Sequence, residues 1–144
     1  MRRRWWLIAT VAGIVWSSAS ARLAANRELT FEDRVLAQER IERVSYAHTI
    51  GSIRSFEEAV PRALLEQRVR TYLKQSRALE LIWHTPVTAA MLQAEADRIT
   101  ASTRMPDRLQ EVRAALLQDE FVFQECFARA ALVDRLAPVY PRNR

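Results

Sequence analysis

Few residues of this chain have the types and spacing that metal binding requires. The candidate ligands are His48, His84 and Cys126, which lie far apart in the sequence, whereas a zinc site needs three or four ligands at suitable spacing. One carboxylate, Glu80, precedes a histidine by a single helical turn, and a Glu–His pair at that spacing is typical of a helix surface. We therefore expect no metal site.

Catalytic chemistry finds no better support. A nucleophilic serine at a nucleophile elbow needs flanking glycines, and a phosphate-binding loop needs several glycines close together. The chain has only two glycines. The adjacent carboxylates Glu57/Glu58 and Asp119/Glu120 stand where helices are expected to begin, and negative charge is favourable at a helix N-terminus. We expect no catalytic residue and no cofactor.

The single cysteine, Cys126, excludes an intramolecular disulfide. On a helix, its simplest role is that of a small buried hydrophobe. An intermolecular disulfide or a reactive thiol is the alternative.

Charge argues against a nucleic-acid partner. The net charge of +5 comes from 22 basic and 17 acidic residues, but three of the basic ones, Arg2–Arg4, belong to a segment that we expect to be removed. The remaining 19 are interleaved with acidic residues, so no patch of one sign is available to bind phosphate. Pairs at i,i+4 spacing, which stabilise helices, are Glu39/Arg43, Glu66/Arg70 and Glu125/Arg129.

The first 21 residues have the three parts of a secretory signal peptide. Met1–Arg4 is basic, Trp5–Trp16 is an apolar run of twelve, and Ser17–Ala21 consists of small residues ending in an Ala-x-Ala pattern. Twelve strongly apolar residues are fewer than the roughly 20 of a spanning helix, so we expect cleavage after Ala21. The mature protein would then be periplasmic or secreted, with no stable membrane span. An uncleaved N-terminal anchor is the alternative.

Beyond the signal, the strongest periodic pattern is Pro61–Trp83. Apolar residues recur there every three or four positions, which predicts an amphipathic helix of roughly 35 Å. Pro61 suits the first helical position, where the N–H that it lacks would have no partner. We expect the domain to be organised on this central helix. Its apolar stripe comprises Leu65, Val69, Tyr72, Leu73, Leu79 and Trp83.

Further helices are expected at 30–49, 89–100, 106–117 and 120–136. Thr30, Thr88 and Asp119 are the predicted N-caps, and Pro106 is a predicted first helical residue. Residues 50–60 are expected to form a connecting loop.

The predicted fold class is therefore all-α, with about five helices in one small orthogonal or irregular bundle. The chain contains no credible strand. The helical domain would span residues 30–137, after a short mobile lead at 22–29 and before a tail at 138–144.

The helix predicted at 120–136 carries aromatic residues on more than one face. Phe123 and Phe127 share a face, whereas Phe121 is about 160° from Phe123 around the helix axis. Either the helix contacts the core on two faces, or an aromatic face is exposed to a partner.

Three segments of these helices follow one another in a familiar order. They are residues 64–80 (LLEQRVRTYLKQSRALE), 85–99 (TPVTAAMLQAEADRI) and 109–136 (LQEVRAALLQDEFVFQECFARAALVDRL). In this order the chain resembles the N-terminal chaperone domain of SurA-type periplasmic foldases, a peptidyl-prolyl isomerase family. The match covers about half of the chain. The residues at the family's pattern positions are Leu64, Leu65, Val87, Thr88, Leu109, Leu116, Phe123, Leu132, Arg135 and Leu136.

The chain departs from that family in two respects. The usual opening strand, with a V-N-x-x-x-I-T signature, is replaced by the helical pattern at 30–49. The parvulin-type catalytic domain has no counterpart, so its catalytic residues have nothing to map onto. The resemblance implies a holdase or client-docking module without isomerase chemistry.

We expect an extracytoplasmic, chaperone-like module that binds unfolded or extended polypeptide, or a partner helix, through an apolar groove beside residues 61–83. A structural or interaction subunit, which packs against a fixed partner or a second copy of itself, is the alternative. A peptidyl-prolyl isomerase-related enzyme is a distant third. The candidate polypeptide-binding residues are Tyr72, Leu73, Trp83, Phe123 and Phe127.

Overall fold

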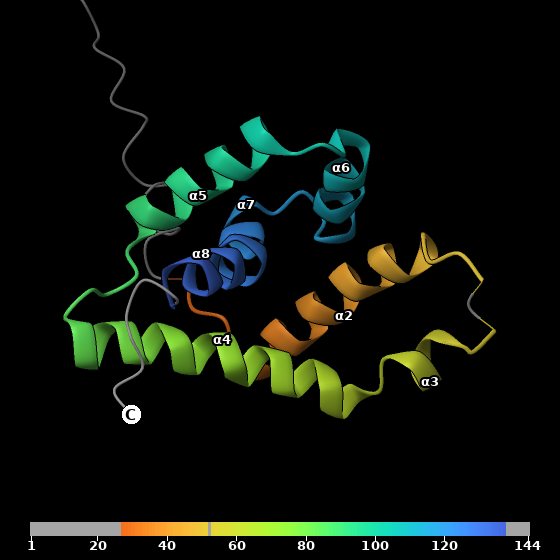
Figure 1. Cartoon of the computed structure of the whole chain (residues 1–144), viewed down its shortest axis with the longest axis horizontal. Helices are drawn as coiled ribbons and strands as arrows, with labels where there is room; N and C mark the ends of the chain where they lie inside the picture. The colour runs from red at the N-terminus through yellow and green to blue at the C-terminus, as the bar shows by residue number, and fades with distance from the viewer. Residues whose placement is uncertain (1–26, 52, 138–144) are drawn as a thin grey trace, which may run out of the picture.

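The computed structural model describes residues 27–51 and 53–137, and these residues form six helices and no strand (Figure 1). The all-α class is thereby confirmed. The predicted signal peptide, most of the predicted lead and the tail lie outside the described residues. The helices are α2 (Phe31–Ala47), α3 (Phe56–Ala59), α4 (Arg62–Trp83), α5 (Ala89–Ser102), α6 (Pro106–Ala115) and a last helix of three consecutive parts, α7 (Glu120–Val122), the π-helical η1 (Phe123–Ala128) and α8 (Arg129–Leu136). We call that last helix, residues 120–136, the C-terminal helix.

The predicted caps start three of these helices. Thr30 Oγ1 accepts a hydrogen bond from the Asp33 N–H (3.1 Å), and the Asp33 carboxylate accepts one from the Thr30 N–H (2.9 Å), which forms a capping box. Thr88 caps α5 and Asp119 caps α7 through their side-chain oxygens. Pro106 is the first residue of α6, as predicted.

The connection between α2 and α4 is not a plain loop, because it contains the four-residue helix α3. Ser55 and Glu58 form a capping box around its first turn, so Glu58 serves α3 and not the following helix. The prediction of a loop over 50–60 was wrong at this point. Pro61 is likewise the N-cap of α4, one residue before the helical position that we predicted for it.

Two turns with left-handed backbone end the middle helices. His84 has a φ of 54° after α4, and Pro86 follows, so the long helix stops at Trp83 as predicted. After α6, Leu117 and Gln118 have φ values of 60° and 57°. This turn ends α6 at Ala115, two residues before the predicted end, and redirects the chain into the C-terminal helix.

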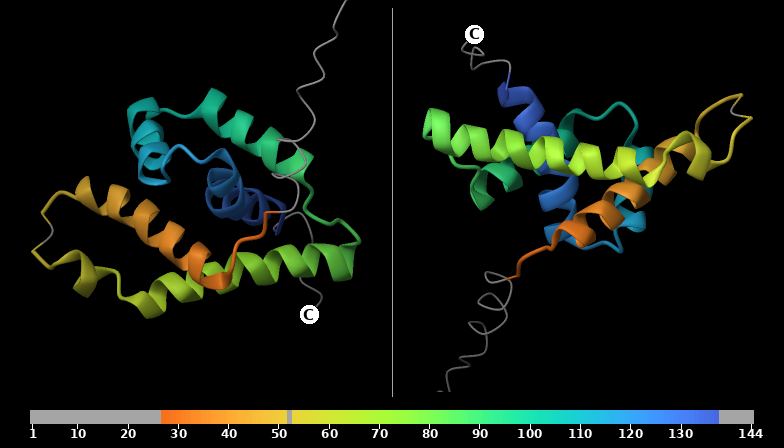
Figure 2. Two further views of the ribbon diagram at one scale, coloured as in Figure 1. Left: turned by 180° about the vertical axis from the view of Figure 1, so that it is seen from behind. Right: turned by 90° about the horizontal axis from the view of Figure 1, so that it is seen from below.

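The C-terminal helix, and not α4, lies at the centre of the bundle (Figures 1 and 2). It contacts α2, α4 and α5, whereas α4 packs mainly on α2 and α8. Eleven of the 22 residues of α4 are exposed, against three of the 17 residues of the C-terminal helix. The prediction that the domain is organised on 61–83 is therefore corrected. That helix is the longest, but it forms one side of the molecule.

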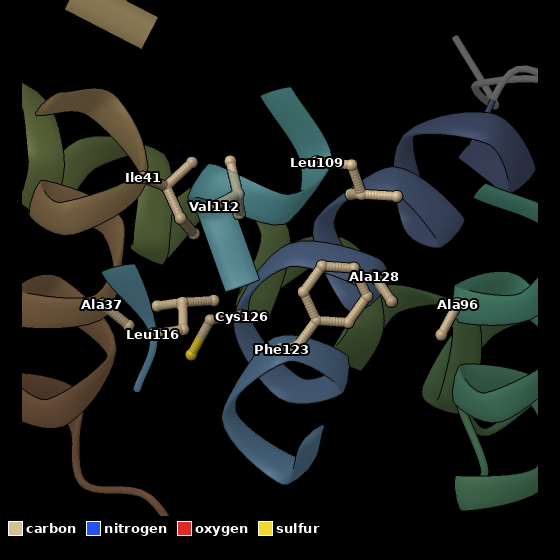
Figure 3. Close-up of a cluster of buried hydrophobic side chains, with 9 residues drawn as sticks. All are labelled: Ala37, Ile41, Ala96, Leu109, Val112, Leu116, Phe123, Cys126 and Ala128. Atoms are coloured by element: carbon tan, nitrogen blue, oxygen red, sulfur yellow. The ribbon is translucent and has the colours of Figure 1, made fainter. Parts of the chain in front are cut away.

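The core divides into two clusters that meet on the C-terminal helix. The first joins this helix to α2, α5 and α6 and comprises Ala37, Ile41, Ala96, Leu109, Val112, Leu116, Phe123, Cys126 and Ala128 (Figure 3). The second joins it to α2 and α4 and comprises Val35, Leu65, Val69, Tyr72, Leu79 and Val133. The C-terminal helix thus contributes Phe123, Cys126 and Ala128 to the first cluster and Val133 to the second, whereas Phe121 belongs to neither.

The three phenylalanines of the C-terminal helix are covered. Phe123 is 1% exposed, and its ring stacks on that of the part-buried Phe127, with centroids 5.2 Å apart. Phe121 is also part-buried, and the Arg27 guanidinium lies 5.2 Å from its ring centroid. The alternative, an aromatic face exposed to a partner, does not hold for these side chains.

A buried carboxylate fastens α5 to the end of the C-terminal helix. Glu95 is 1% exposed, and it accepts hydrogen bonds from Arg98 of α5 and from Arg135 of α8, the latter at 2.7 Å. Glu95 is buried on α5 next to Ala96 of the first cluster. A charged residue can be buried there because the two guanidinium groups, which remain half-exposed themselves, compensate its charge.

Candidate polypeptide-binding groove

The structure separates the five predicted binding residues into two groups. Tyr72, Leu73 and Trp83 belong to the second core cluster, whereas Phe123 and Phe127 belong to the first. Tyr72 is 4% exposed, Phe123 is 1% exposed, and the other three are part-buried. These residues therefore do not form one contiguous apolar groove, because most of their surface stabilises the bundle.

A groove does run beside the long helix. Most of its lining residues are polar in type, although more of its exposed surface is apolar than polar. It has a volume of about 520 Å³ and lies between α4 on one side and α2 and α8 on the other. Of the five predicted residues, only Tyr72 lines it. The lining residues are Gln38, Leu64, Gln67, Arg68, Thr71, Tyr72, Gln75, Ala130, Ala131 and Asp134.

The α4 wall of the groove is a stripe of residues at helical spacing. Leu64, Arg68, Thr71 and Gln75 recur every three or four positions, and Gln67 precedes Thr71 by one turn. The same spacing continues through Ala78 to Ile82, whose side chain is 59% exposed. The stripe therefore ends in apolar side chains and is polar in its middle.

Several polar groups of the lining have no partner among the described residues. The carboxamides of Gln67 and Gln75 make no hydrogen bond there, and the exposed Asp134 carboxylate makes no ion pair. Arg68, in contrast, pairs with Glu42 of α2. The groove thus presents two available amides and one uncompensated negative charge.

Among the lining residues, Tyr72 is buried (4% exposed). The Tyr72 hydroxyl lies near Arg34 and Cys126, but no hydrogen bond of normal geometry joins it to either group. Burial raises the pKa of Tyr72 to about 12 and the pKa of Cys126 to about 11, so both groups stay neutral at physiological pH. Cys126 is 1% exposed, which confirms the prediction of a small buried hydrophobe.

A part-buried ion network holds the C-terminal helix against α2. Glu125 pairs with Arg34 of α2 (2.9 Å) and with Arg129 one turn later (2.7 Å). Burial acts to raise the pKa of Glu125, but the hydrogen bonds from Arg129 and Arg34 outweigh it and hold the pKa below its ordinary value. Arg34 also donates to the Glu125 carbonyl oxygen (3.0 Å), which lies within the π-helical turn η1.

The candidate metal ligands His48, His84 and Cys126 do not line the groove. His48 pairs with Glu111 of α6 at 2.6 Å. Glu80, which we expected to pair with His84, pairs instead with Arg77 at 2.6 Å. Within residues 27–51 and 53–137, no group of three His, Cys, Asp or Glu side chains is arranged to hold a metal ion.

One wall of the groove has a recognisable pattern in the sequence. Gln67, Thr71 and Gln75 are uncharged polar residues at i, i+4 and i+8, and they stand beside the apolar stripe in a helix otherwise rich in arginine and glutamate. A charged helix face is usually solvated, whereas a row of amides and hydroxyls can line a binding surface. What the sequence could not supply is the opposite wall, Ala130, Ala131 and Asp134.

Comparison with known proteins found no match. The chain matches no family model, no curated protein and no solved structure. In the part of the chain that the structure describes, no helix combines the length and the apolar character that crossing a membrane requires.

Proposed function

We propose that this protein is an extracytoplasmic polypeptide-binding module, chaperone-like and without catalytic activity. The observation that carries the proposal is the groove of about 520 Å³ beside α4, with the available amides of Gln67 and Gln75 on one wall. A groove that runs beside a helix, with exposed amides on one wall and small residues on the far wall, suits a peptide chain better than it suits a compact ligand. The predicted signal peptide and the helix order that resembles the SurA N-terminal domain support the same function.

The test is suppression of aggregation. The protein is produced with its own signal sequence and purified from the periplasm, where N-terminal sequencing is expected to begin at Arg22. It is then mixed with an unfolded outer-membrane protein diluted from urea, and light scattering is followed. A several-fold excess is expected to lower the scattering. Unchanged scattering at every ratio would overturn the proposal, and recovery of the chain from the membrane fraction with Met1 still in place would support the uncleaved anchor.

Two further assays separate the alternatives. Size-exclusion chromatography with light scattering tests the interaction subunit, for which the exposed Leu81 and Ile82 at the end of α4 offer an apolar contact (57% and 59% exposed). A tight dimer that binds no hydrophobic dye would favour that alternative over the chaperone. A prolyl-peptide isomerisation assay tests the enzyme, and we expect no acceleration.

A further inference from the structure

We propose that the groove binds the backbone of an extended polypeptide through the ladder Gln67–Thr71–Gln75 and that Asp134 selects a cationic side chain in the bound segment. This inference rests on the proposed function and names the ligand conformation and the side-chain chemistry that the groove recognises. Three observations carry it: the spacing of the ladder, the availability of its polar groups, and the charge of the lining.

The ladder matches the repeat of an extended chain. Residues four apart on α4 are about 6 Å apart along the helix axis, so Gln67 and Gln75 are separated by about 12 Å. In an extended strand, alternate residues present their N–H and C=O groups on the same side, at a repeat of about 6.6 Å. Three rungs therefore span about 12 Å on the protein and about 13 Å on the ligand, a difference that flexible glutamine side chains can absorb.

The polar groups of the ladder are of the type that pairs with a peptide backbone. A glutamine carboxamide carries both a donor and an acceptor, so one side chain can pair with the N–H and the C=O of one ligand residue. Neither Gln67 nor Gln75 uses these groups within the described residues. The Thr71 hydroxyl donates to the Gln67 carbonyl oxygen at 2.8 Å and keeps its lone pairs for a ligand N–H.

The charge of the lining favours a basic side chain in the ligand. Arg68 and Asp134 are the two charged residues that line the groove, and Glu42 compensates Arg68. The remaining charge is the Asp134 carboxylate on α8, across the groove from the ladder. Ala130 and Ala131 beside it have short side chains, which leaves room for a lysine or arginine to reach Asp134 while the backbone stays on α4.

The test measures binding of fluorescent peptides of about eight residues, which exceeds the roughly six residues that an extended chain needs to cover Leu64–Gln75. The peptides are rich in Thr and Val and differ only at a central Lys, Ala or Glu. An exposed ion pair contributes at most about 1 kcal/mol, so the Lys peptide is expected to bind about three- to fivefold tighter than the Glu peptide at low salt. This preference should decrease at high ionic strength.

Variants of the groove make the inference falsifiable. Asp134→Asn should remove the preference, and Asp134→Lys should reverse it in favour of the Glu peptide. Gln67→Ala combined with Gln75→Ala should weaken all three peptides equally, by about fivefold or more. Matched controls are Asp107→Asn and Gln110→Ala on α6, which are also exposed and lie outside the groove lining. Circular dichroism verifies that each variant keeps its helices.

The outcomes distinguish this inference from the proposed function. If the wild-type protein binds no peptide, the proposed function fails. If it binds peptides but Asp134→Lys leaves the Lys-over-Glu preference unchanged, or the ladder variant binds as the wild type does, the inference is overturned while the proposed function stands. If the groove variants instead abolish a dimer of the wild-type protein, a second copy of the chain occupies the groove and the inference is likewise overturned.

Discussion

The long helix α4 and the C-terminal helix differ in how much of their surface the bundle buries. α4 buries one stripe of side chains and exposes half of its residues, including Leu81 and Ile82 at its end. The C-terminal helix is shorter but contacts neighbours on several sides, and only Glu120, Asp134 and Arg135 are exposed. The helix with the clearest amphipathic pattern is therefore the peripheral one.

This difference has a physical cause. A helix packed on one side alternates buried and exposed residues with the helical period, so its sequence pattern is strong. A helix surrounded by others has few exposed positions, and its sequence loses that period. Periodicity thus identifies the helix that borders solvent, and the groove lies along this same border. The central helix provides the opposite wall of the groove, with Ala130, Ala131 and Asp134.

The largest loss of stability should come from shortening a buried side chain of the C-terminal helix. Phe123 is 1% exposed and stacks on Phe127, so Phe123→Ala would leave a large cavity between the helices of the first cluster. We expect a loss of about 3 to 5 kcal/mol in the free energy of unfolding, measured by urea denaturation. The part-buried Phe121→Ala is the matched control and should lose clearly less.

A smaller loss is expected for a buried residue of α4. Leu79 is 1% exposed, but α4 borders solvent on its other side, so neighbouring side chains can move to reduce the cavity. Leu79→Ala should therefore lower the free energy of unfolding by about 2 to 3 kcal/mol. The comparison between the two helices would be broken if Leu79→Ala proved as destabilising as Phe123→Ala.

Lowering the pH should affect the ion pairs of the two helices differently. Because hydrogen bonds from Arg129 and Arg34 hold the pKa of Glu125 below its value in the unfolded chain, protonation favours unfolding. This contribution is present above the unfolded pKa and is lost as the pH falls through the folded pKa. Glu125→Gln should lose about 1.5 kcal/mol near pH 7 and show a flatter dependence of the urea midpoint between pH 7 and pH 3.

The corresponding pair on α4 provides the control. Glu80 and Arg77 are both about half-exposed, with 48% and 62% of their side-chain surfaces accessible. Glu80→Gln should therefore leave the pH profile close to that of the wild type. A profile that changes equally in both variants would mean that the Glu125 network is no more important than a surface pair.

The smallest effect is expected at the exposed end of α4. Leu81 is 57% exposed, so Leu81→Ala should change the free energy of unfolding by no more than about 0.5 kcal/mol. Equilibrium denaturation measures this change. A loss comparable with that of Leu79→Ala would show that Leu81 is covered in solution, which would favour the interaction subunit over a monomeric chaperone.

Local signals account for most of what could be predicted. The capping residues Thr30, Thr88 and Asp119 act within three residues of themselves, so their hydrogen bonds were predictable from the chain. Ser55 and Glu58 have the same capping-box spacing and start α3, although we expected Glu57 and Glu58 to stand at the start of the following helix. The i,i+4 pairs Glu39/Arg43, Glu66/Arg70 and Glu125/Arg129 form as predicted.

The π-helical turn η1 could not be predicted from local sequence signals. Nothing in FQECFA indicates an i→i+5 pattern, and the group that donates to the Glu125 carbonyl is Arg34, 91 positions earlier in the chain. The ion network of Glu125 combines the predicted i,i+4 pair with the same distant arginine. Such contacts depend on the packing of α2 against the C-terminal helix.

The sequence by itself determined that the described chain is helical, where most helices begin and end, and that Cys126 and most of the α4 stripe are buried. These features depend on spacing, capping and composition within one helix. Tertiary structure alone decided that the C-terminal helix is central, that the candidate aromatic residues stabilise two core clusters, and that a groove forms beside α4. Each of these depends on which helices meet, and a groove exists only once walls from distant segments, Gln67 on α4 and Asp134 on α8, stand on either side of it.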